Sequence, residues 1–599
     1  MNKKTDAASA ANGARTTRTW TRAWAVAFAA AATLTACGGS SNPPPSSNPP
    51  PVDPPVAVDP ALRQTTTGTV QGVNDAAKSG TYFWKGVPYA QAPAGALRWR
   101  APAAPTSWSG TRDAKKFASA CLQIGRMFGP GANNTYDATI GTTMGQPLGS
   151  EDCLYLNVWR PATEDKSLPV LIFVHGGSNI SGYTADPIYD GANLAKAANA
   201  VVVTINYRLG ILGFLNVPQM ATADGEDSGN FALLDIMAAL RFVQGNAAAF
   251  GGDAGNVTLS GESAGAVNLL ALMSSAKSAG LFHKAIEMSG GISLASNLPP
   301  GTVAALSPAS ASLAQGNAIL AALLVADGTA ANTVAAQTYL ATQTPAQIAA
   351  YMRSKDGSAL LSVVSNAGLN SANPIPDGKL VPADPISAMA AGQGVNVPLL
   401  AGNTKEEGKL FASLFPALNP LFPSGWIVDD ATRFSMMFNT NPDAPPTLAL
   451  ADIIHPAYLP VDKPGTGYNA MTGLVTSLMF EANRTNLLNT LAPQQAKLWH
   501  YRFDWAQAPA PWNDVYGAAH AFDLPFLFGN FGPSVVASVA FNKANEPGRM
   551  ALSKAFMASV GAFMRTGDPN ASALGVTWKP WPASLLLDAT ASASAITAP

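Results

Sequence analysis

The sequence predicts an α/β protein with a large, mostly parallel central sheet flanked by helices. Two observations carry this prediction. Apolar runs recur as continuous Val, Ile and Leu stretches, which is typical of strands covered on both faces. Helical patterns lie between these runs with short connections, an alternation typical of parallel sheets. The chain has 599 residues, of which 47% are hydrophobic, so it can bury a large core.

Six apolar runs are predicted to be strands. They are 169–177, 200–208, 256–261, 284–291, 397–403 and 497–505. A helix is predicted over 231–250, where apolar residues recur near helical spacing. The Ala-rich stretch 300–395 is helical in character and predicts an inserted cap or helical subregion.

The N-terminus predicts export. A positively charged leader and a short apolar stretch make residues 1–36 a secretory signal peptide. The end of this stretch, Leu34-Thr35-Ala36-Cys37, resembles the lipobox of bacterial lipoproteins, in which the cysteine is lipidated. Residues 37–63 are then a lipid-anchored, Pro/Ser-rich linker that favours extended polyproline II, and residues 64–599 form the folded domain. The alternative is an ordinary cleaved signal, with a periplasmic or secreted product.

The cysteines and the residue after the anchor refine this expectation. Once Cys37 carries lipid, only Cys121 and Cys153 remain, and an oxidising compartment favours a disulfide between them. Gly38 replaces the aspartate that commonly retains lipoproteins at an inner membrane, so we expect an outer-membrane lipoprotein of the cell envelope.

The charge balance and the spacing of the histidines give no reason to expect nucleic acid or a metal ion as a partner. The chain has 36 basic and 37 acidic residues, a balance that gives no reason to expect nucleic acid as a partner. The five histidines lack metal-ligand spacing, so neither a metal nor another cofactor is expected.

A G-x-S-x-G motif, Gly261 to Gly265, lies between the strand 256–261 and a predicted helix. In a nucleophile elbow, the serine sits on a strained strand-to-helix turn, and glycines flank it because a Cβ would collide there. Ser263 is therefore a candidate nucleophile, and the N–H of Ala264 is a candidate oxyanion donor.

A serine nucleophile needs a general base and a carboxylate that orients the base. In α/β-hydrolases the base follows the serine in the chain, which excludes His175. His520 lies among small residues and is the best candidate. The remaining three, His283, His455 and His500, are expected to be structural. Glu406 and Glu407 follow the strand 397–403, so both are candidate orienting acids, with a solvated loop as the alternative.

The glycine-rich segment His175-Gly176-Gly177-Ser178-Asn179 follows the apolar strand residues 170–174. An oxyanion hole needs backbone N–H groups close to the substrate, and glycine permits that approach. This segment is therefore a candidate oxyanion loop, although a tight turn would also explain the glycines.

Together these segments resemble the type-B carboxylesterases, the cholinesterase-like branch of the α/β-hydrolase fold. The similarity runs from "FWKGVPYAQAPAGALRW" at 83–99 to "MRTGDPN" at 564–570. Between them stand "SEDCLYLNV" at 150–158, "INYRLG" at 205–210 and "FGGDAGNVTLSGESAGA" at 250–266. The resemblance implies an α/β-hydrolase fold with helical insertions and no cofactor.

The resemblance also implies roles for individual residues. The catalytic residues would be Ser263, Glu407 rather than Glu406, and His520. The oxyanion donors would be the N–H groups of Gly177, Ser178 and Ala264, and the disulfide would join Cys121 to Cys153.

Two departures from the family pattern bear on specificity. Ser178 and Asn179 replace the usual Gly-Phe of the oxyanion loop, and the loop between the cysteines carries no tryptophan. Because cholinesterases hold their quaternary ammonium against that tryptophan, a choline ester is not expected as the substrate.

We therefore expect a serine carboxylic-ester hydrolase that acts on a small-molecule ester through an acyl-enzyme. One alternative is a lipase or polyester hydrolase of the cell envelope, which the membrane tether alone suggests. The other is a non-catalytic binding protein on the same fold.

Overall fold

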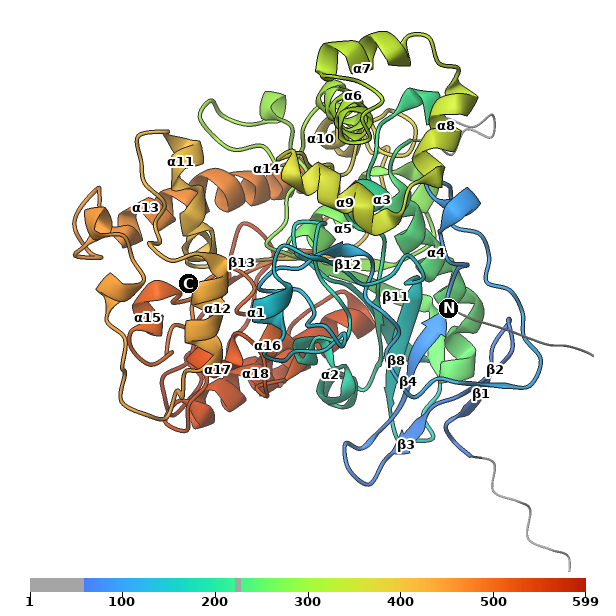
Figure 1. Ribbon diagram of the computed structural model, residues 1–599. Helices are drawn as coiled ribbons and strands as arrows, with labels where there is room; N and C mark the ends of the chain where they lie inside the picture. Colours follow the sequence, from blue (N-terminus) through green and yellow to red (C-terminus); the bar gives the residue numbers. More distant parts are fainter. Residues whose placement is uncertain (1–58, 221–227) are drawn as a thin grey trace, which may run out of the picture. The chain divides into compact units, whose positions relative to one another are not determined.

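The computed structural model describes residues 59–220 and 228–599 of the chain, and Figure 1 shows the arrangement of their helices and strands. The predicted signal peptide, the anchor Cys37 and residues 37–58 of the predicted linker lie outside the described residues. The last linker residues, 59–63, are described, and strand β1 begins among them at Leu62, so the folded part starts before the predicted residue 64.

A ten-stranded sheet is the centre of this fold. Its order is β15-β14-β13-β12-β11-β9-β10-β8-β4-β3. The parallel part comprises β9 (Leu168–Val174), β10 (Val201–Ile205), β11 (Gly252–Glu262), β12 (Lys284–Met288), β13 (Leu399–Thr404), β14 (Leu498–Phe503) and β15 (Leu585–Leu587). The antiparallel part comprises β3 (Val73–Asp75), β4 (Thr81–Pro88) and β8 (Tyr155–Pro161). The six strands predicted from apolar runs are confirmed as β9 to β14, and the mostly parallel sheet is confirmed with them.

Two small sheets accompany the central one. One contains β1 (Leu62–Gln64), β2 (Thr69–Gln71) and β5 (Thr111–Asp113), and the other pairs β6 (Gln123–Ile124) with β7 (Pro147–Leu148).

Eighteen α-helices surround the sheets in the described part of the chain. They are α1 (Ile140–Thr143), α2 (Ala192–Ala198), α3 (Gly210–Gly213), α4 (Phe231–Asn246), α5 (Ala264–Ser274), α6 (Ala309–Ala326), α7 (Thr333–Leu340), α8 (Pro345–Ser354), α9 (Gly357–Asn366), α10 (Pro385–Ala390), α11 (Phe415–Leu418), α12 (Asp430–Phe438), α13 (Tyr468–Val475), α14 (Ala482–Leu491), α15 (Trp512–Val515), α16 (Leu524–Phe528), α17 (Ala537–Ala540) and α18 (Glu546–Thr566). The helix predicted over 231–250 is α4, extended by a 3₁₀ turn over Ala247–Phe250.

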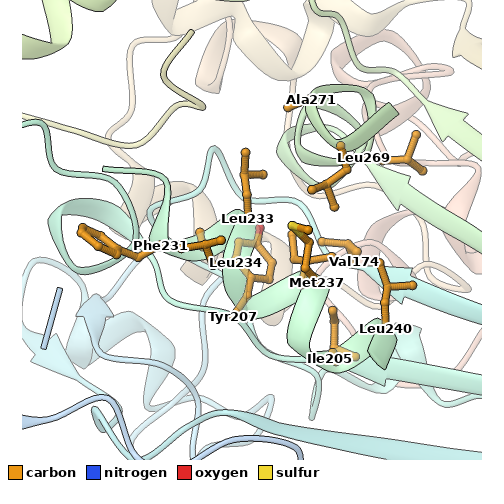
Figure 2. Close-up of a cluster of buried hydrophobic side chains, with 14 of the residues drawn as sticks. Val174, Ile205, Tyr207, Phe231, Leu233, Leu234, Met237, Leu240, Leu269 and Ala271 are labelled. Atoms are coloured by element: carbon orange, nitrogen blue, oxygen red, sulfur yellow. The ribbon is translucent and has the colours of Figure 1, made fainter. Parts of the chain in front are cut away.

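Burial on both faces explains the continuous apolar strands. Along β9, Ile172 and Val174 belong to one hydrophobic core, whereas Leu171 and Phe173 belong to a second core on the opposite face. Successive strand residues point to opposite faces, so a strand with helices on both sides needs apolar side chains throughout. Figure 2 shows part of the first core, where Leu240 of α4 and Leu269 of α5 lie with Val174 and other strand residues.

The helical stretch predicted over 300–395 contains α6 to α10, which confirms its helical character. Figure 1 shows α6 to α9 grouped at the top of the view. By length and composition α6 could cross a membrane, but its Ile319, Leu320 and Leu323 are buried in the first core. These side chains show that α6 is a packed helix of the cap.

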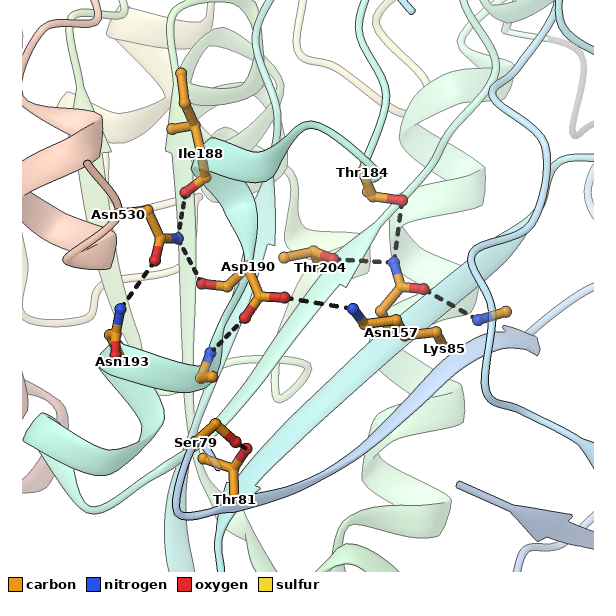
Figure 3. A network of polar contacts seen from close by, with 12 residues as sticks. Ser79, Thr81, Lys85, Asn157, Thr184, Ile188, Asp190, Asn193, Thr204 and Asn530 are labelled. Carbon is orange, nitrogen blue, oxygen red and sulfur yellow. Dashed lines mark hydrogen bonds and ion pairs between the residues drawn. The ribbon is translucent and has the colours of Figure 1, made fainter. Parts of the chain in front are cut away.

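A polar network fastens the antiparallel strands to the segment that follows β9. The Asn157 side-chain amide donates to the hydroxyls of Thr184 (3.0 Å) and Thr204 (3.1 Å). Lys85 forms an ion pair with Asp190 at 3.3 Å. Figure 3 shows these contacts joined around the 184–190 segment. This segment leads away from the oxyanion loop, so the network fixes one end of the chain that carries it.

Candidate active site

The G-x-S-x-G motif forms the predicted turn between a strand and a helix. β11 ends at Glu262, and α5 begins at Ala264. Ser263 lies between them with φ 54° and ψ −124°, a conformation that costs a non-glycine residue on the order of 1–3 kcal/mol. The turn therefore holds Ser263 in a strained backbone conformation at the N-terminus of α5.

The two motif glycines are required by close backbone contacts. A Cβ on Gly261 would lie 2.4 Å from the carbonyl carbon of Gly265. A Cβ on Gly265 would lie 2.1 Å from the carbonyl oxygen of Val174 at the end of β9. No side chain fits at either position, so α5 can approach β9 only because residue 265 is glycine.

The structure brings His520 and Glu407 together. The Nδ1 of His520 lies 2.6 Å from the Oε2 of Glu407, and both side chains are buried. His520 precedes α16, in the loop of small residues where the sequence placed it, and Glu407 follows β13. The two residues are 113 positions apart in the chain, yet they meet beside the carboxyl ends of the parallel strands.

Hydrogen bonds fix the Glu407 carboxylate in place. Its Oε1 accepts from the hydroxyl of Ser289 (2.6 Å) and from the backbone N–H of Thr404 (2.8 Å). The side-chain amide of Asn403 also donates to this oxygen, at 3.3 Å. The Oε2 atom remains directed at His520. Ser289 was not predicted as a site residue, because the sequence placed it inside the strand 284–291. In the structure β12 ends at Met288, and Ser289 follows it with φ 54°.

Glu406, the other candidate acid, is directed elsewhere. Its carboxylate pairs with Lys409 at 2.7 Å and accepts the backbone N–H of Ala518 at 2.9 Å. The structure therefore separates the two adjacent glutamates, with Glu407 on His520 and Glu406 on Lys409.

The second ring nitrogen of His520 faces the nucleophile turn. Its Nε2 lies 3.1 Å from the Oε1 of Glu262, the residue before Ser263. The contact lacks hydrogen-bond geometry, and both atoms are buried without a hydrogen-bond partner among the described residues. Phe411 and Phe480 flank the imidazole, with ring centroids 4.9 and 5.1 Å from it. The Nδ1 of the imidazole is thus hydrogen-bonded, its Nε2 is not hydrogen-bonded to any described residue, and two phenylalanine rings flank the side chain.

Several buried acids govern the electrostatics around this imidazole. Burial by itself lowers the pKa of His520, but the nearby carboxylates of Glu262, Glu407 and Asp523 outweigh it and raise that pKa to about 9. Burial raises the pKa of Glu262 to about 8, against the attraction of His520. Burial likewise raises the pKa of Asp523, which accepts the Tyr501 hydroxyl at 2.7 Å, to about 6. The site therefore favours the protonated imidazole.

The other four histidines have structural contacts, as the sequence predicted for His283, His455 and His500. His283 accepts the N–H of Val257, His455 accepts the N–H of Ala457, and the His500 ring contacts Arg484 and Ser584. Burial lowers the pKa of His175 to about 4, and its Nδ1 lies 2.8 Å from the carbonyl oxygen of Gly176. His175 is therefore neutral at pH 7 and donates from Nδ1 to its own loop.

The candidate oxyanion loop lies against the nucleophile turn. A Cβ on Gly176 would lie 2.9 Å from the Cβ of Ser263, so the loop backbone touches the turn. Gly177 (φ 104°), Ser178 (φ 56°) and Asn179 (φ 56°) all have positive φ. Ser178 thus adopts the left-handed conformation that glycine, the usual residue of the family at this position, adopts more easily.

A cavity of about 320 Å³ lies beside this loop. Ile180 and Gly210 contribute to its wall, and the Gly210 N–H donates to the Asn179 carbonyl oxygen at 2.6 Å. Arg126 supplies the charged side chain of the lining. The predicted disulfide between Cys121 and Cys153 is present, and it closes the loop that bears Arg126.

In the described ranges, no three His, Cys, Asp or Glu side chains are placed to hold a metal ion. The fold and these residues define an α/β-hydrolase with a serine on a nucleophile elbow and a histidine–glutamate pair beside it.

Comparisons with known proteins agree with that class. The model of the carboxylesterase family matches residues 59–592. The para-nitrobenzyl esterase of Bacillus subtilis is 32% identical over 522 residues, covering 87% of this chain and 91% of that protein. The fumonisin B1 esterase of Sphingopyxis macrogoltabida is 33% identical over 489 residues, covering 80% and 76%. A solved carboxylesterase from Geobacillus stearothermophilus matches with TM-score 0.65 and 28% identity over 90% of this chain and 98% of that chain.

The chain belongs to the carboxylesterase family, and it is a carboxylic ester hydrolase with the α/β-hydrolase fold.

The contact at Gly265 generates a prediction about the elbow. Gly265→Ala should lower both the melting temperature and the esterase activity, because its Cβ would push α5 away from the Val174 carbonyl. Gly473→Ala is the matched control, since Gly473 lies on the exposed face of α13 with open space around it. It should be neutral or stabilising, by up to about 1 kcal/mol. Thermal unfolding and ester hydrolysis of both variants check this, and a fully active, equally stable Gly265→Ala would contradict it.

Proposed function

We propose that Ser263, His520 and Glu407 form the catalytic triad of this hydrolase. The observation that carries the proposal is the 2.6 Å contact of His520 with Glu407, which leaves Nε2 free beside the residue that precedes Ser263. A base held on one nitrogen and open on the other can accept a proton from a neighbouring hydroxyl.

The reaction follows from this arrangement. The Nε2 of His520 takes the Ser263 proton while Oγ attacks the ester carbonyl and forms a tetrahedral intermediate. The imidazolium then gives that proton to the departing alcohol, and an acyl-enzyme remains. Water repeats the sequence and releases the acid. Glu407 holds Nδ1–H throughout, and the buried carboxylates stabilise the imidazolium that forms in each step.

The tetrahedral oxygen carries a negative charge that needs donors. The backbone N–H groups of Gly177, Ser178 and Ala264 are the proposed oxyanion donors, since the loop touches the nucleophile turn and Ala264 starts α5. The N-terminus of α5 adds a field that favours this charge.

The substrate is proposed to be a small-molecule carboxylic ester. Two relatives, named para-nitrobenzyl esterase and fumonisin B1 esterase, support an ester substrate.

The enzyme is further proposed to be an exported lipoprotein of the cell envelope, anchored through Cys37 and facing an oxidising compartment. The charged leader, the apolar stretch and the lipobox-like residues before Cys37 support this. The Cys121–Cys153 disulfide also supports export, because such bonds persist mainly outside the cytosol. Residue 38 is glycine and not the aspartate that commonly retains lipoproteins at an inner membrane, which favours an outer-membrane location.

The triad assignment predicts large losses from single substitutions. Ser263→Ala and His520→Ala should each lower kcat/KM for p-nitrophenyl acetate by about 10⁴-fold or more, because the nucleophile or its base is removed. His455→Ala is the matched control and should retain activity, since His455 only caps a short turn. A fluorophosphonate should label wild type on Ser263, and wild type as inert as Ser263→Ala would refute the proposal.

The buried acids predict a pH effect. In the free enzyme His520 must be neutral to act as base, so kcat/KM should rise with pH through the pKa of His520. Glu262→Gln removes a negative charge 3.1 Å from Nε2 and lowers that pKa, which should move the rising limb to lower pH by about one unit. In this variant the carboxylates of Glu407 and Asp523 are still present and still raise the pKa of His520.

Glu406→Gln is the control for this measurement, because the Glu406 carboxylate pairs with Lys409 instead of His520. Its rising limb should stay where it is in wild type. Full pH profiles of kcat/KM for the three proteins check the assignment, and an unmoved limb in Glu262→Gln would contradict it.

The anchor predicts detergent partitioning. Full-length protein expressed in a Gram-negative host should partition into the detergent phase of Triton X-114, because its N-terminal acyl chains are apolar. Cys37→Ala should partition into the aqueous phase with unchanged esterase activity per folded molecule. A wild type that stays in the aqueous phase would refute the anchor.

A further inference from the structure

A buried pair of amide side chains links the oxyanion loop to the nucleophile helix. The Oδ1 of Asn179 accepts from the Nδ2 of Asn268 at 2.8 Å, and the Nδ2 of Asn179 donates to the Oδ1 of Asn268 at 3.2 Å. Neither residue exposes any surface. Asn268 lies on α5, five positions after Ser263, so this reciprocal bond spans the two elements that supply the oxyanion donors.

Tyr207, which follows β10, completes the network. Its hydroxyl lies 2.8 Å from the carbonyl oxygen of His175 and 3.0 Å from the Oδ1 of Asn179, and it can donate its single proton to one of them at a time. Its ring stacks on the imidazole of His175, with centroids 4.7 Å apart. The loop is therefore held at both of its ends, by Tyr207 at His175 and by Asn268 at Asn179.

The loop needs such support because its backbone is strained. Gly177, Ser178 and Asn179 have positive φ in succession, and two of them carry a Cβ. Asparagine is one of the few residues other than glycine that enters this region readily, since its short polar side chain can form local hydrogen bonds. Here the side chain bonds to α5 instead, and the carbonyl oxygen of Asn179 accepts the Gly210 N–H at 2.6 Å.

Burial makes this contact selective for one loop position. A buried amide that loses its partner is left with unpaired donors and acceptors, which is far less favourable than a paired amide. Any movement of the loop away from α5 would unpair both amides at once. The pair therefore penalises displacements of the loop relative to the helix N-terminus, where Ala264 lies.

We propose that Asn179 and Asn268 are positioning residues, whose mutual hydrogen bonds fix the distance between the Gly177–Ser178 donors and the Ala264 donor of the oxyanion hole. The inference rests on the proposed function, because it assumes that these amides receive the tetrahedral oxygen. An oxyanion hole stabilises the transition state more than the bound ester, so the pair should act on kcat and leave KM nearly unchanged.

The test uses Asn179→Gly, which keeps the backbone free to adopt positive φ, and Asn268→Leu, which replaces the amide by an apolar side chain of similar size. Each should lower kcat for p-nitrophenyl acetate by about 10- to 100-fold, with KM within about threefold of wild type. The inhibition constant of a trifluoromethyl ketone, which forms a tetrahedral adduct on serine, should rise in proportion to the loss of kcat/KM. The double variant should lose less than the product of the two single losses, because both remove the same interaction.

A matched control separates positioning from general stability. Asn230 is also a fully buried asparagine, with two hydrogen bonds to the backbone of Ile375 (2.9 and 2.7 Å). Asn230→Ala should lower the melting temperature and leave kcat unchanged. Titration of Ser263 with a fluorophosphonate gives kcat per competent site, so a partly unfolded variant does not imitate a catalytic loss.

The outcomes are distinct. If kcat per titrated site in Asn179→Gly and Asn268→Leu stays within twofold of wild type, or if only KM changes, the positioning role is overturned. If the inhibition constant does not follow the loss of kcat/KM, the role is likewise overturned. Loss of activity in Ser263→Ala together with normal turnover in both asparagine variants would refute this inference alone. Full activity in Ser263→Ala would instead refute the proposed triad.

Discussion

The close approach of α5 to the end of β9 is the contact on which the site depends. At Gly265 the helix backbone lies so near the Val174 carbonyl oxygen that a Cβ would be only 2.1 Å from it. The same approach sets Ser263 at the N-terminus of α5 and brings the loop that follows Val174 against the nucleophile turn. Because residue 265 is glycine, Ser263, the N-terminus of α5 and the backbone amides of the loop can lie close to one another.

Buried carboxyl groups raise the pKa of the His520 imidazole. Four carboxyl groups are buried in or next to the site. Those of Glu262, Glu287 and Glu407 lie at or directly after the carboxyl ends of β11, β12 and β13, and that of Asp523 lies directly before α16. Burial raises the pKa of Glu287 to about 7, as it does for Glu262 and Asp523. Such acids are unfavourable in a low-dielectric site unless a cation is near, and the cation that chemistry supplies is the imidazolium of His520. The buried carboxylates therefore stabilise the positive charge that forms on His520 during the reaction.

The oxyanion loop shows how a departure from a family pattern can be accommodated. Its Ser178 and Asn179 carry side chains at positive φ, where glycine is the easier choice. The side chain of Asn179 finds its partner on α5, and the stacking of Tyr207 on His175 supports the other end of the loop. In this chain the asparagine at position 179 forms a polar contact between the loop and the helix, so the local sequence change has a tertiary partner.

Much of this architecture could be predicted from local patterns. The strands β9 to β14 are continuous apolar runs because both faces of the sheet are covered. Such runs can be recognised in the sequence without knowledge of the structure. The nucleophile turn was also predictable, because the G-x-S-x-G motif follows a predicted strand. Gly261 is required by a contact within the turn, whereas Gly265 is required by Val174 at the end of the adjacent strand β9. The antiparallel strands β3, β4 and β8 were not singled out. β3 has only three residues, and polar residues such as Lys85 in β4 and Asn157 and Arg160 in β8 interrupt the apolar runs.

The sequence by itself determined the fold class and the nucleophile turn, since these follow from the burial pattern of single elements and from a five-residue motif. It indicated the family through the resemblance of several motifs between residues 83 and 570. It left Glu406 and Glu407 as neighbours that residue chemistry alone could not separate. The family resemblance favoured Glu407, and the tertiary structure shows the physical difference, because Glu407 meets His520 while Glu406 meets Lys409. The tertiary structure also revealed Ser289, Glu262 and the Asn179–Asn268 pair. Those contacts join residues distant in the chain, and their partners are fixed only when the strands and helices pack, because a side-chain hydrogen bond depends on distances of a few tenths of an ångström.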